Sequence, residues 1–107
     1  MQSLTLKDII LDSLDEIKAI DSVVMDVKKL GVFSDYIMIS TGTSRRHIKA
    51  ISSSVIQTLK KNNLSNIGIE GQDQDDWVLV DAGDIIINVM TEEARNFYDL
   101  EGLWDVE

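Results

Sequence analysis

Five aspartates in the second half of the chain are the residues best suited by type to bind a metal ion. Asp73 and Asp75 precede a predicted strand that Asp76 begins, and Asp81 and Asp84 bracket the turn that follows it. Carboxylate oxygens are the hard ligands that Mg²⁺ and Ca²⁺ prefer, so a nucleotidyl-transfer site is one interpretation. The pair at the turn flanks it, however, and does not alternate along one strand face, and turns select Asp for local backbone hydrogen bonds. We therefore predict that Asp81 and Asp84 are structural turn residues and that the chain holds no metal ion.

The segment TGTSRRH, residues 41–47, has the composition of a turn that leads from a strand into a helix. Free N–H groups at a helix N-terminus can bind an anion, but the segment lacks the spaced glycines and the lysine of a phosphate-binding loop. We interpret Gly42 as the turn residue and Thr43 or Ser44 as the helix cap. His47 could act as a base for a serine, but sequence shows no triad geometry, and we expect a solvated side chain in the first helical turn.

Trp77 follows a run of aspartates and is the second residue of the predicted strand DWVLVD. Alternation along a strand places Trp77, Leu79 and Asp81 on one face and Val78 and Val80 on the other. The two valines are the natural core pair. Trp77 and Leu79 then either pack under the C-terminal helix or stay partly exposed, in which case the indole could anchor a partner.

The composition of the chain restricts its function. With no cysteine and one histidine among 107 residues, the chain can form neither a disulfide nor a thiolate zinc site nor an imidazole cluster. The N-terminal segment carries Asp8, Asp12, Asp15 and Glu16 where a signal peptide needs an apolar core, and no run is long enough to cross a membrane. We expect a soluble cytoplasmic protein. Its net charge of −9 opposes binding to DNA or RNA phosphates and favours a basic partner.

Hydrophobic periodicity predicts one α/β domain over residues 1–107. A helix is expected over residues 5–20, a second within the segment 42–61 after its opening turn and cap, and a short terminal helix capped by Thr91. Apolar and β-branched runs predict strands over residues 22–27, 35–41, 66–71, 76–81 and 84–90, the last two joined as a hairpin through Gly83. The strand over 35–41 is apolar on both faces and should be central. It should run parallel to the strand over 66–71, with a right-handed crossover through the second helix.

Three long segments carry a resemblance to a known family: SDYIMISTGTSRRHIKAI, GIEGQDQDDWVLVDAGDIIINVM and EEARNFYDLEGLW. They resemble the ribosomal silencing factor family, also called Iojap-like proteins, and the match covers nearly the whole chain. Its motifs are specific in combination: D-Y followed by S-T-G-T-S-x-R-H, E-G, D-W-V-L-V-D-x-G-D and F-Y-D-L-E-x-L-W. The loop around Val32 and Phe33 is the stretch that the family pattern does not place.

The resemblance implies an α/β fold similar to nucleotidyltransferases but without their activity, with a mixed sheet of about five strands flanked by helices. It implies a translational repressor, without a cofactor, that binds large-subunit ribosomal protein fourteen. Bound there, the protein would sterically block joining of the small subunit and lower translation when nutrients are scarce. The family's partner-binding region corresponds to the hairpin and the terminal helix, with Asp76, Trp77, Asp81, Tyr98 and Asp99 as site residues. An acidic surface with aromatic anchors suits a basic ribosomal protein.

Two other functions remain open. A nucleotidyltransferase-like enzyme would use Asp81 and Asp84 as metal ligands and would turn over a nucleoside triphosphate. An RNA-binding ribosome assembly factor would lose affinity for naked RNA as salt rises. Its basic patch would consist of Arg45, Arg46, Lys49, Lys60 and Lys61. We expect any rRNA contact to be secondary, and a homodimer of the free protein also stays open.

Overall fold

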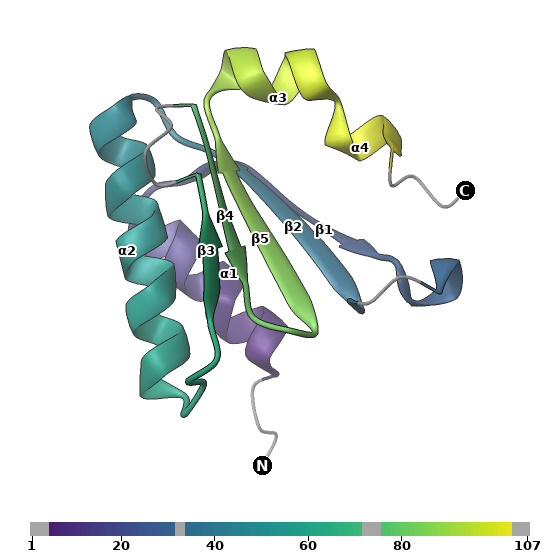
Figure 1. Cartoon of the computed structure of the whole chain (residues 1–107). Coiled ribbons are helices and arrows are strands. Elements are labelled where there is room, and N and C mark those ends of the chain that lie inside the picture. The colour runs from purple at the N-terminus through teal and green to yellow at the C-terminus, as the bar shows by residue number, and fades with distance from the viewer. Residues whose placement is uncertain (1–4, 32–33, 72–75, 104–107) are drawn as a thin grey trace.

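The computed structural model describes residues 5–31, 34–71 and 76–103 (Figure 1). The loop around Val32 and Phe33 lies outside these residues. The elements are α1 Leu6–Glu16, β1 Ile20–Asp26, the 3-10 helix η1 Lys28–Leu30, β2 Tyr36–Thr41, α2 Arg45–Lys61, β3 Gly68–Glu70, β4 Trp77–Asp81, β5 Ile85–Met90, α3 Glu92–Tyr98 and α4 Leu100–Leu103. In the described part of the chain, no helix has the length and apolarity needed to cross a membrane.

The five strands form one mixed sheet in the order β1-β2-β5-β4-β3. β2 and β5 are parallel, whereas the β1–β2, β4–β5 and β3–β4 pairs are antiparallel. β3 therefore runs in the same direction as β2, as predicted, although β5 and β4 lie between them. β2 is an interior strand, but the middle position belongs to β5, whose six residues are all buried. The predicted mixed five-stranded α/β fold is confirmed.

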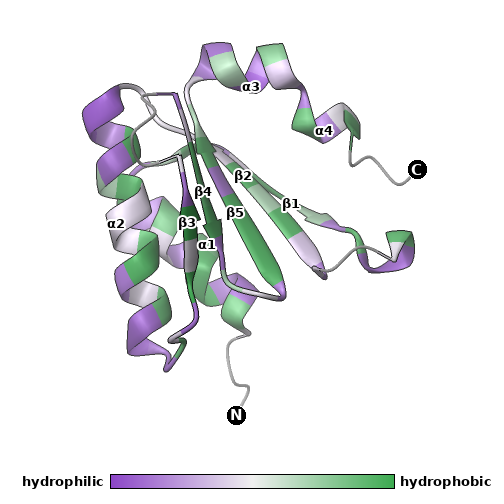
Figure 2. Ribbon diagram, viewed as in Figure 1, coloured by the Kyte–Doolittle hydropathy of each residue, from purple (hydrophilic) through white to green (hydrophobic). Residues whose placement is uncertain are grey.

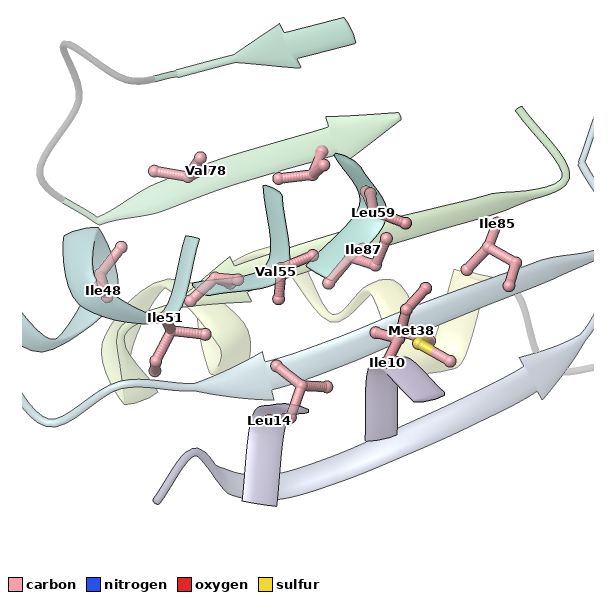
Figure 3. Packing of buried hydrophobic residues seen from close by; sticks show 12 residues of the cluster. Ile10, Leu14, Met38, Ile48, Ile51, Val55, Leu59, Val78, Ile85 and Ile87 are labelled. Atoms are coloured by element: carbon pink, nitrogen blue, oxygen red, sulfur yellow. The ribbon is translucent and has the colours of Figure 1, made fainter. Parts of the chain in front are cut away.

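The main core lies between one face of the sheet and the two long helices, α1 and α2. Figure 3 shows side chains from both helices pointing toward those of β2, β4 and β5. The buried core residues are Ile10, Leu14, Met38, Ile48, Ile51, Val55, Leu59, Val78, Val80, Ile85, Ile87 and Val89. The predicted core pair is confirmed, since Val78 is 2% and Val80 0% exposed. Figure 2 shows that the strands are largely hydrophobic, in green, and that both ends of α2 carry hydrophilic residues, in purple.

The opposite face of the sheet carries a smaller apolar cluster. It consists of Val27, Ile37, Ile39, Met90 and Ala94, with Trp77 and Leu100 partly buried against it. α3 and α4 lie on this side, away from α2 (Figure 1). The two faces of the sheet thus present different helices to solvent.

Helix α1 begins where the sequence predicts and ends earlier. Thr5 caps it, because its hydroxyl accepts a hydrogen bond from the N–H of Asp8 at 3.2 Å. The predicted end at residue 20 is wrong, since the helix ends at Glu16 and Lys18 has a φ of 61°. A left-handed residue cannot continue a right-handed helix, so the chain turns there and enters β1 at Ile20.

The predicted hairpin is confirmed. β4 and β5 pair antiparallel from Trp77 opposite Met90 to Asp81 opposite Ile86. The N–H of Ala82 donates to the carbonyl of Ile85 at 2.9 Å. Gly83 has a φ of 87°, a conformation that glycine adopts without steric cost.

The terminal helix is broken where the sequence predicts one continuous helix. Thr91 caps α3 as expected, with its hydroxyl accepting from the N–H of Ala94 at 3.1 Å. Asp99 ends α3 in the left-handed conformation, with φ 47° and ψ 54°. Its carboxylate then accepts a hydrogen bond from the N–H of Gly102 at 3.2 Å, which stabilises the start of α4.

Candidate functional site

Trp77, the first residue of β4, is held by two neighbours. Its Nε1–H donates a hydrogen bond to Oδ1 of Asn88 on β5, with 2.9 Å between the two atoms. Asn88 is 3% exposed, and its amide also donates to the carbonyl of Met38 at 3.3 Å. The indole lies 4.8 Å from the ring of Tyr98, centroid to centroid. Trp77 therefore packs beneath α3 and is also partly exposed, so the two predicted placements of the ring hold together. Its role as an anchor for a partner stays a prediction.

Two aromatic side chains of α3 extend this surface. Tyr98 is 46% exposed, and Phe97, whose ring lies edge-on to it at 5.0 Å, is 81% exposed. We name Trp77, Phe97 and Tyr98 the aromatic patch. Contiguous exposed apolar side chains, unlike scattered ones, mark protein-interaction surfaces.

Carboxylates border the aromatic patch. A cavity of about 420 Å³ beside it is lined by Glu70, Gly71, Asp76, Trp77, Leu79 and Tyr98. The side chain of Asp76 is exposed, while its carbonyl accepts from the N–H of Thr91 at 3.0 Å. This bond ties the start of β4 to the end of β5. Asp99 follows Tyr98 directly, so acidic groups flank the aromatic rings on both segments.

The structure brings together four of the five predicted site residues, namely Asp76, Trp77, Tyr98 and Asp99. Asp81 lies at the other end of β4, roughly 13 Å from Trp77 at ~3.3 Å per residue. Its carboxylate accepts a hydrogen bond from the N–H of Gly83 at 2.8 Å. Asp81 nevertheless shares a strand face with Trp77, so both side chains point to the side that carries α3.

Two residues that sequence reasoning missed hold the patch in place. Asn88 fixes the indole through the hydrogen bond that it accepts from Nε1. Its position as the one polar residue within the apolar run IIINVM could have indicated a structural role from the sequence. Arg95 has a side chain that is 10% exposed, with Nε donating to Glu101 Oε1 at 2.8 Å and a terminal nitrogen donating to Thr41 Oγ1 at 2.9 Å. Hydrogen bonding from Arg95 lowers the pKa of Glu101. Arg95 thereby joins α3, α4 and β2, and no local sequence pattern marks it.

The hairpin turn is held by the carboxylate of Asp81 and by the main-chain carbonyl of Asp84. In the described part of the chain, no group of three or more histidine, aspartate or glutamate side chains is placed to hold a metal ion. The predicted turn role of Asp81 is confirmed by its bond to Gly83. The carbonyl of Asp84 accepts from the N–H groups of Asp35 and Tyr36 at 2.8 and 3.0 Å. Of the other candidate carboxylates, Asp76 is exposed. The aspartates at positions 73 and 75 lie outside the described residues.

The prediction of a solvated His47 is wrong. Its Nδ1 accepts from the N–H of Thr43 at 2.9 Å, so Nε2 carries the proton and donates to the carbonyl of Ile17 at 2.8 Å. His47 thus ties the start of α2 to the end of α1. The predicted cap is confirmed, since Ser44 Oγ accepts from the N–H of His47 at 3.1 Å. These bonds occupy N–H groups that an anion would need.

Comparison with known proteins decides the family. The family model described as Ribosomal silencing factor during starvation matches residues 1–107. The chain belongs to the ribosomal silencing factor family. Ribosomal silencing factor RsfS of Chromobacterium violaceum is 38% identical over 94 residues, which cover 88% of this chain and 77% of that protein. The resemblance inferred from the sequence motifs is therefore confirmed.

Relatives of the ribosomal silencing factor family extend to eukaryotes and to solved structures. Mitochondrial assembly of ribosomal large subunit protein 1 of Mus musculus is 36% identical over 100 residues, or 91% of this chain and 44% of that protein. A crystal structure of a Chromobacterium violaceum protein has a TM-score of 0.89 at 36% identity, covering 97% of this chain and 87% of that one. The further likeness to nucleotidyltransferases stays a prediction.

Proposed function

We propose that this protein is a ribosome-associated silencing factor that binds the large ribosomal subunit and sterically prevents the small subunit from joining. Membership of a family described by silencing during starvation supports repression of translation when nutrients are scarce. The mouse relative, named for assembly of the ribosomal large subunit, supports the choice of subunit. Steric exclusion needs no covalent step. This agrees with the names of the family and of its relatives, which describe ribosomal silencing and no catalysed reaction. The proposal places the protein in the cytoplasm with the ribosomes.

The aromatic patch is the observation that carries the proposal. Phe97 and Tyr98 expose large ring surfaces beside Trp77, and carboxylates surround them. Aromatic residues at the centre of an interface supply most of its affinity, whereas charged residues at the rim speed association. We therefore assign the patch as the anchor for large-subunit ribosomal protein fourteen, with acidic residues steering that basic partner.

The predicted site residue Asp81 fits the rim of the same interface. A standard interface buries roughly 800 Å² per partner, which corresponds to a disc roughly 30 Å across. Asp81, roughly 13 Å from Trp77 along β4 and on the same strand face, falls within that radius. Asp76 and Asp99 lie nearer the aromatic rings.

Sedimentation of purified ribosomal subunits with added protein tests the proposed function. We expect the protein to migrate with the free large subunit and not with the small one. Subunit joining should fall in proportion to occupancy of the large subunit. Migration with neither subunit, together with unchanged joining, would contradict the proposal.

Substitution of Tyr98 tests the assigned surface. Tyr98→Ala should weaken binding to isolated ribosomal protein fourteen about thirtyfold, as ~2 kcal/mol implies. A matched control is Leu30→Ala, because Leu30 has the same 46% exposure but lies in η1, outside the patch. Asp76→Asn should slow association and flatten its salt dependence with little effect on dissociation. Equal affinity of Tyr98→Ala and Leu30→Ala would show that the partner binds elsewhere.

A further inference from the structure

Positive charge is concentrated on α2 in an otherwise acidic protein. Residues 45–61 contain five of the ten basic residues and none of the nineteen acidic ones. The helix therefore carries a charge of +5 and the rest of the chain −14, which together give the net −9. A segregation this strong on one element is unlike a solubilising surface, where both signs are interspersed.

Five of the exposed side chains of α2 form one stripe. At 100° per residue, five exposed residues fall within an arc of roughly 80°, opposite the side chains that enter the main core. The stripe consists of Arg46, Lys49, Ser53, Gln57 and Lys60, all of them exposed. It is roughly 21 Å long at ~1.5 Å per residue, with cations toward both ends and neutral polar groups between them. Figure 2 shows the hydrophilic ends of this helix.

The chemistry of the stripe fits a nucleic acid backbone better than a protein. Protein interfaces are centred on aromatic or aliphatic anchors, and the large exposed apolar residues in the described chain all lie outside α2: Ile20, Leu30, Phe97, Tyr98 and Leu103. RNA helices, in contrast, are bound mainly through phosphates and ribose 2′-hydroxyls. Lysine and arginine bind the former, and Ser53 and Gln57 can hydrogen-bond the latter.

The acidic groups elsewhere do not cancel this local charge. α2 and α3, the helix that carries two rings of the aromatic patch, lie on opposite faces of the sheet (Figure 1), roughly 20 Å apart at ~10 Å per packed layer. The Debye length at physiological ionic strength is about 8 Å, so charges across the sheet are screened. α1, whose Ser13 bonds Ser54 of α2, is acidic and exposes Asp12, Asp15 and Glu16. These carboxylates repel RNA from the side of α2 that faces α1. The side of α2 that faces away from α1 therefore remains the favourable one for RNA.

We propose that the α2 stripe is a second interaction surface that binds the phosphate backbone of an RNA helix. The identification of that RNA as ribosomal rests on the proposed function, whereas RNA binding itself does not. Because the two surfaces face opposite ways, one molecule can contact a ribosomal protein through the aromatic patch and RNA through α2. Such a contact adds affinity for the large subunit without requiring a base sequence.

Fluorescence anisotropy with the full chain and a labelled RNA duplex of about 20 base pairs tests the proposal. The three basic residues of the stripe, Arg46, Lys49 and Lys60, predict a slope of log affinity against log salt of about −2.7, at about −0.9 per phosphate contact. Affinity should therefore fall about fortyfold between about 50 and 200 mM salt. Lys49→Gln should reduce the slope by about one, and Lys49→Gln with Lys60→Gln by about two.

Lys29→Gln is the matched control, because Lys29 is an exposed lysine of η1 and its loss changes the net charge equally. It should leave RNA affinity unchanged, and all variants should melt like the wild type. The α2 variants should bind isolated ribosomal protein fourteen normally, and Tyr98→Ala should bind RNA normally. Failure of the RNA-binding proposal can therefore be distinguished from failure of the proposed function. Equal loss in Lys29→Gln, no loss in the double variant, or equal competition by polyglutamate at matched charge would overturn the proposal.

Discussion

Replacing Trp77 with Phe isolates the hydrogen bond that the indole donates to Asn88. Phenylalanine keeps an aromatic ring beside Tyr98 but has no Nε1–H, so Oδ1 of Asn88 loses this donor. An unsatisfied buried acceptor costs about 1–3 kcal/mol. Asn88 is 3% exposed, but Trp77 itself is partly exposed and water can approach from its side. We therefore expect Trp77→Phe to lower the free energy of unfolding by about 1–2 kcal/mol.

Trp77→Ala removes the ring as well as the donor. An aromatic pair is worth about 0.5–1.5 kcal/mol beyond its area burial, so the total loss should reach about 2–4 kcal/mol, within the range for large-to-small substitutions. For a domain of this size about 4 °C of melting temperature corresponds to 1 kcal/mol. The expected decreases are then about 4–8 °C for Trp77→Phe and about 8–16 °C for Trp77→Ala.

Urea denaturation followed by circular dichroism, and binding kinetics on the same preparations, provide the measurements. Trp77→Phe should bind ribosomal protein fourteen within about threefold of wild type, and Trp77→Ala about thirtyfold more weakly. A double-mutant cycle of Trp77→Phe with Asn88→Ala should show at least about 0.5 kcal/mol of coupling. Wild-type stability of Trp77→Phe with no coupling would refute the role of the hydrogen bond. Unchanged affinity of a folded Trp77→Ala would refute the anchor.

Three further predictions follow from the same contacts. His47→Ala should lower the free energy of unfolding by about 1–2 kcal/mol in urea denaturation, because the hydrogen bonds of the imidazole to the N–H of Thr43 and to the carbonyl of Ile17 are lost, whereas exposed Arg46→Ala should not. The folded-state pKa of Glu101 is lowered, so its stabilisation is present above the ordinary glutamate value of about 4.3 and lost as pH falls through the folded pKa. Glu101→Gln should therefore flatten acid denaturation below about pH 4.3, a result contradicted by superimposable curves. Calorimetry with Mg²⁺ and a nucleoside triphosphate should show no binding, and a saturable signal lost in Asp84→Ala would support the enzyme alternative.

Features set by near neighbours in the sequence were predictable. Thr5, Ser44 and Thr91 accept hydrogen bonds from N–H groups three residues ahead, as the composition of each helix start indicates. Alternation alone placed Val78 and Val80 in the core. Trp77 and Tyr98 were assigned to one site through the family resemblance, and the structure places their rings in contact.

Features set by long-range contacts were not predictable from local pattern. His47 depends on the carbonyl of Ile17, thirty residues away, and Arg95 on Thr41, fifty-four residues away. The break at Asp99 is likewise linked to tertiary structure, because Arg95 is held at once by β2 and by Glu101 of α4. A sequence window that contains only one partner of such a pair carries no signal for the contact.

The order of strands explains how one small domain can present two chemically opposite surfaces. β2 and β5 are parallel neighbours, but β2 leads into α2 on one face of the sheet and β5 leads into α3 on the other. The basic helix and the acidic aromatic patch are therefore separated by the sheet itself, although both begin at the same ends of adjacent strands. If both connections lay on one face, the basic residues of α2 would lie within a Debye length of the carboxylates around Trp77. The opposite charges would then largely neutralise each other. The topology keeps both charges available, so that a basic protein and an RNA backbone could be bound at the same time.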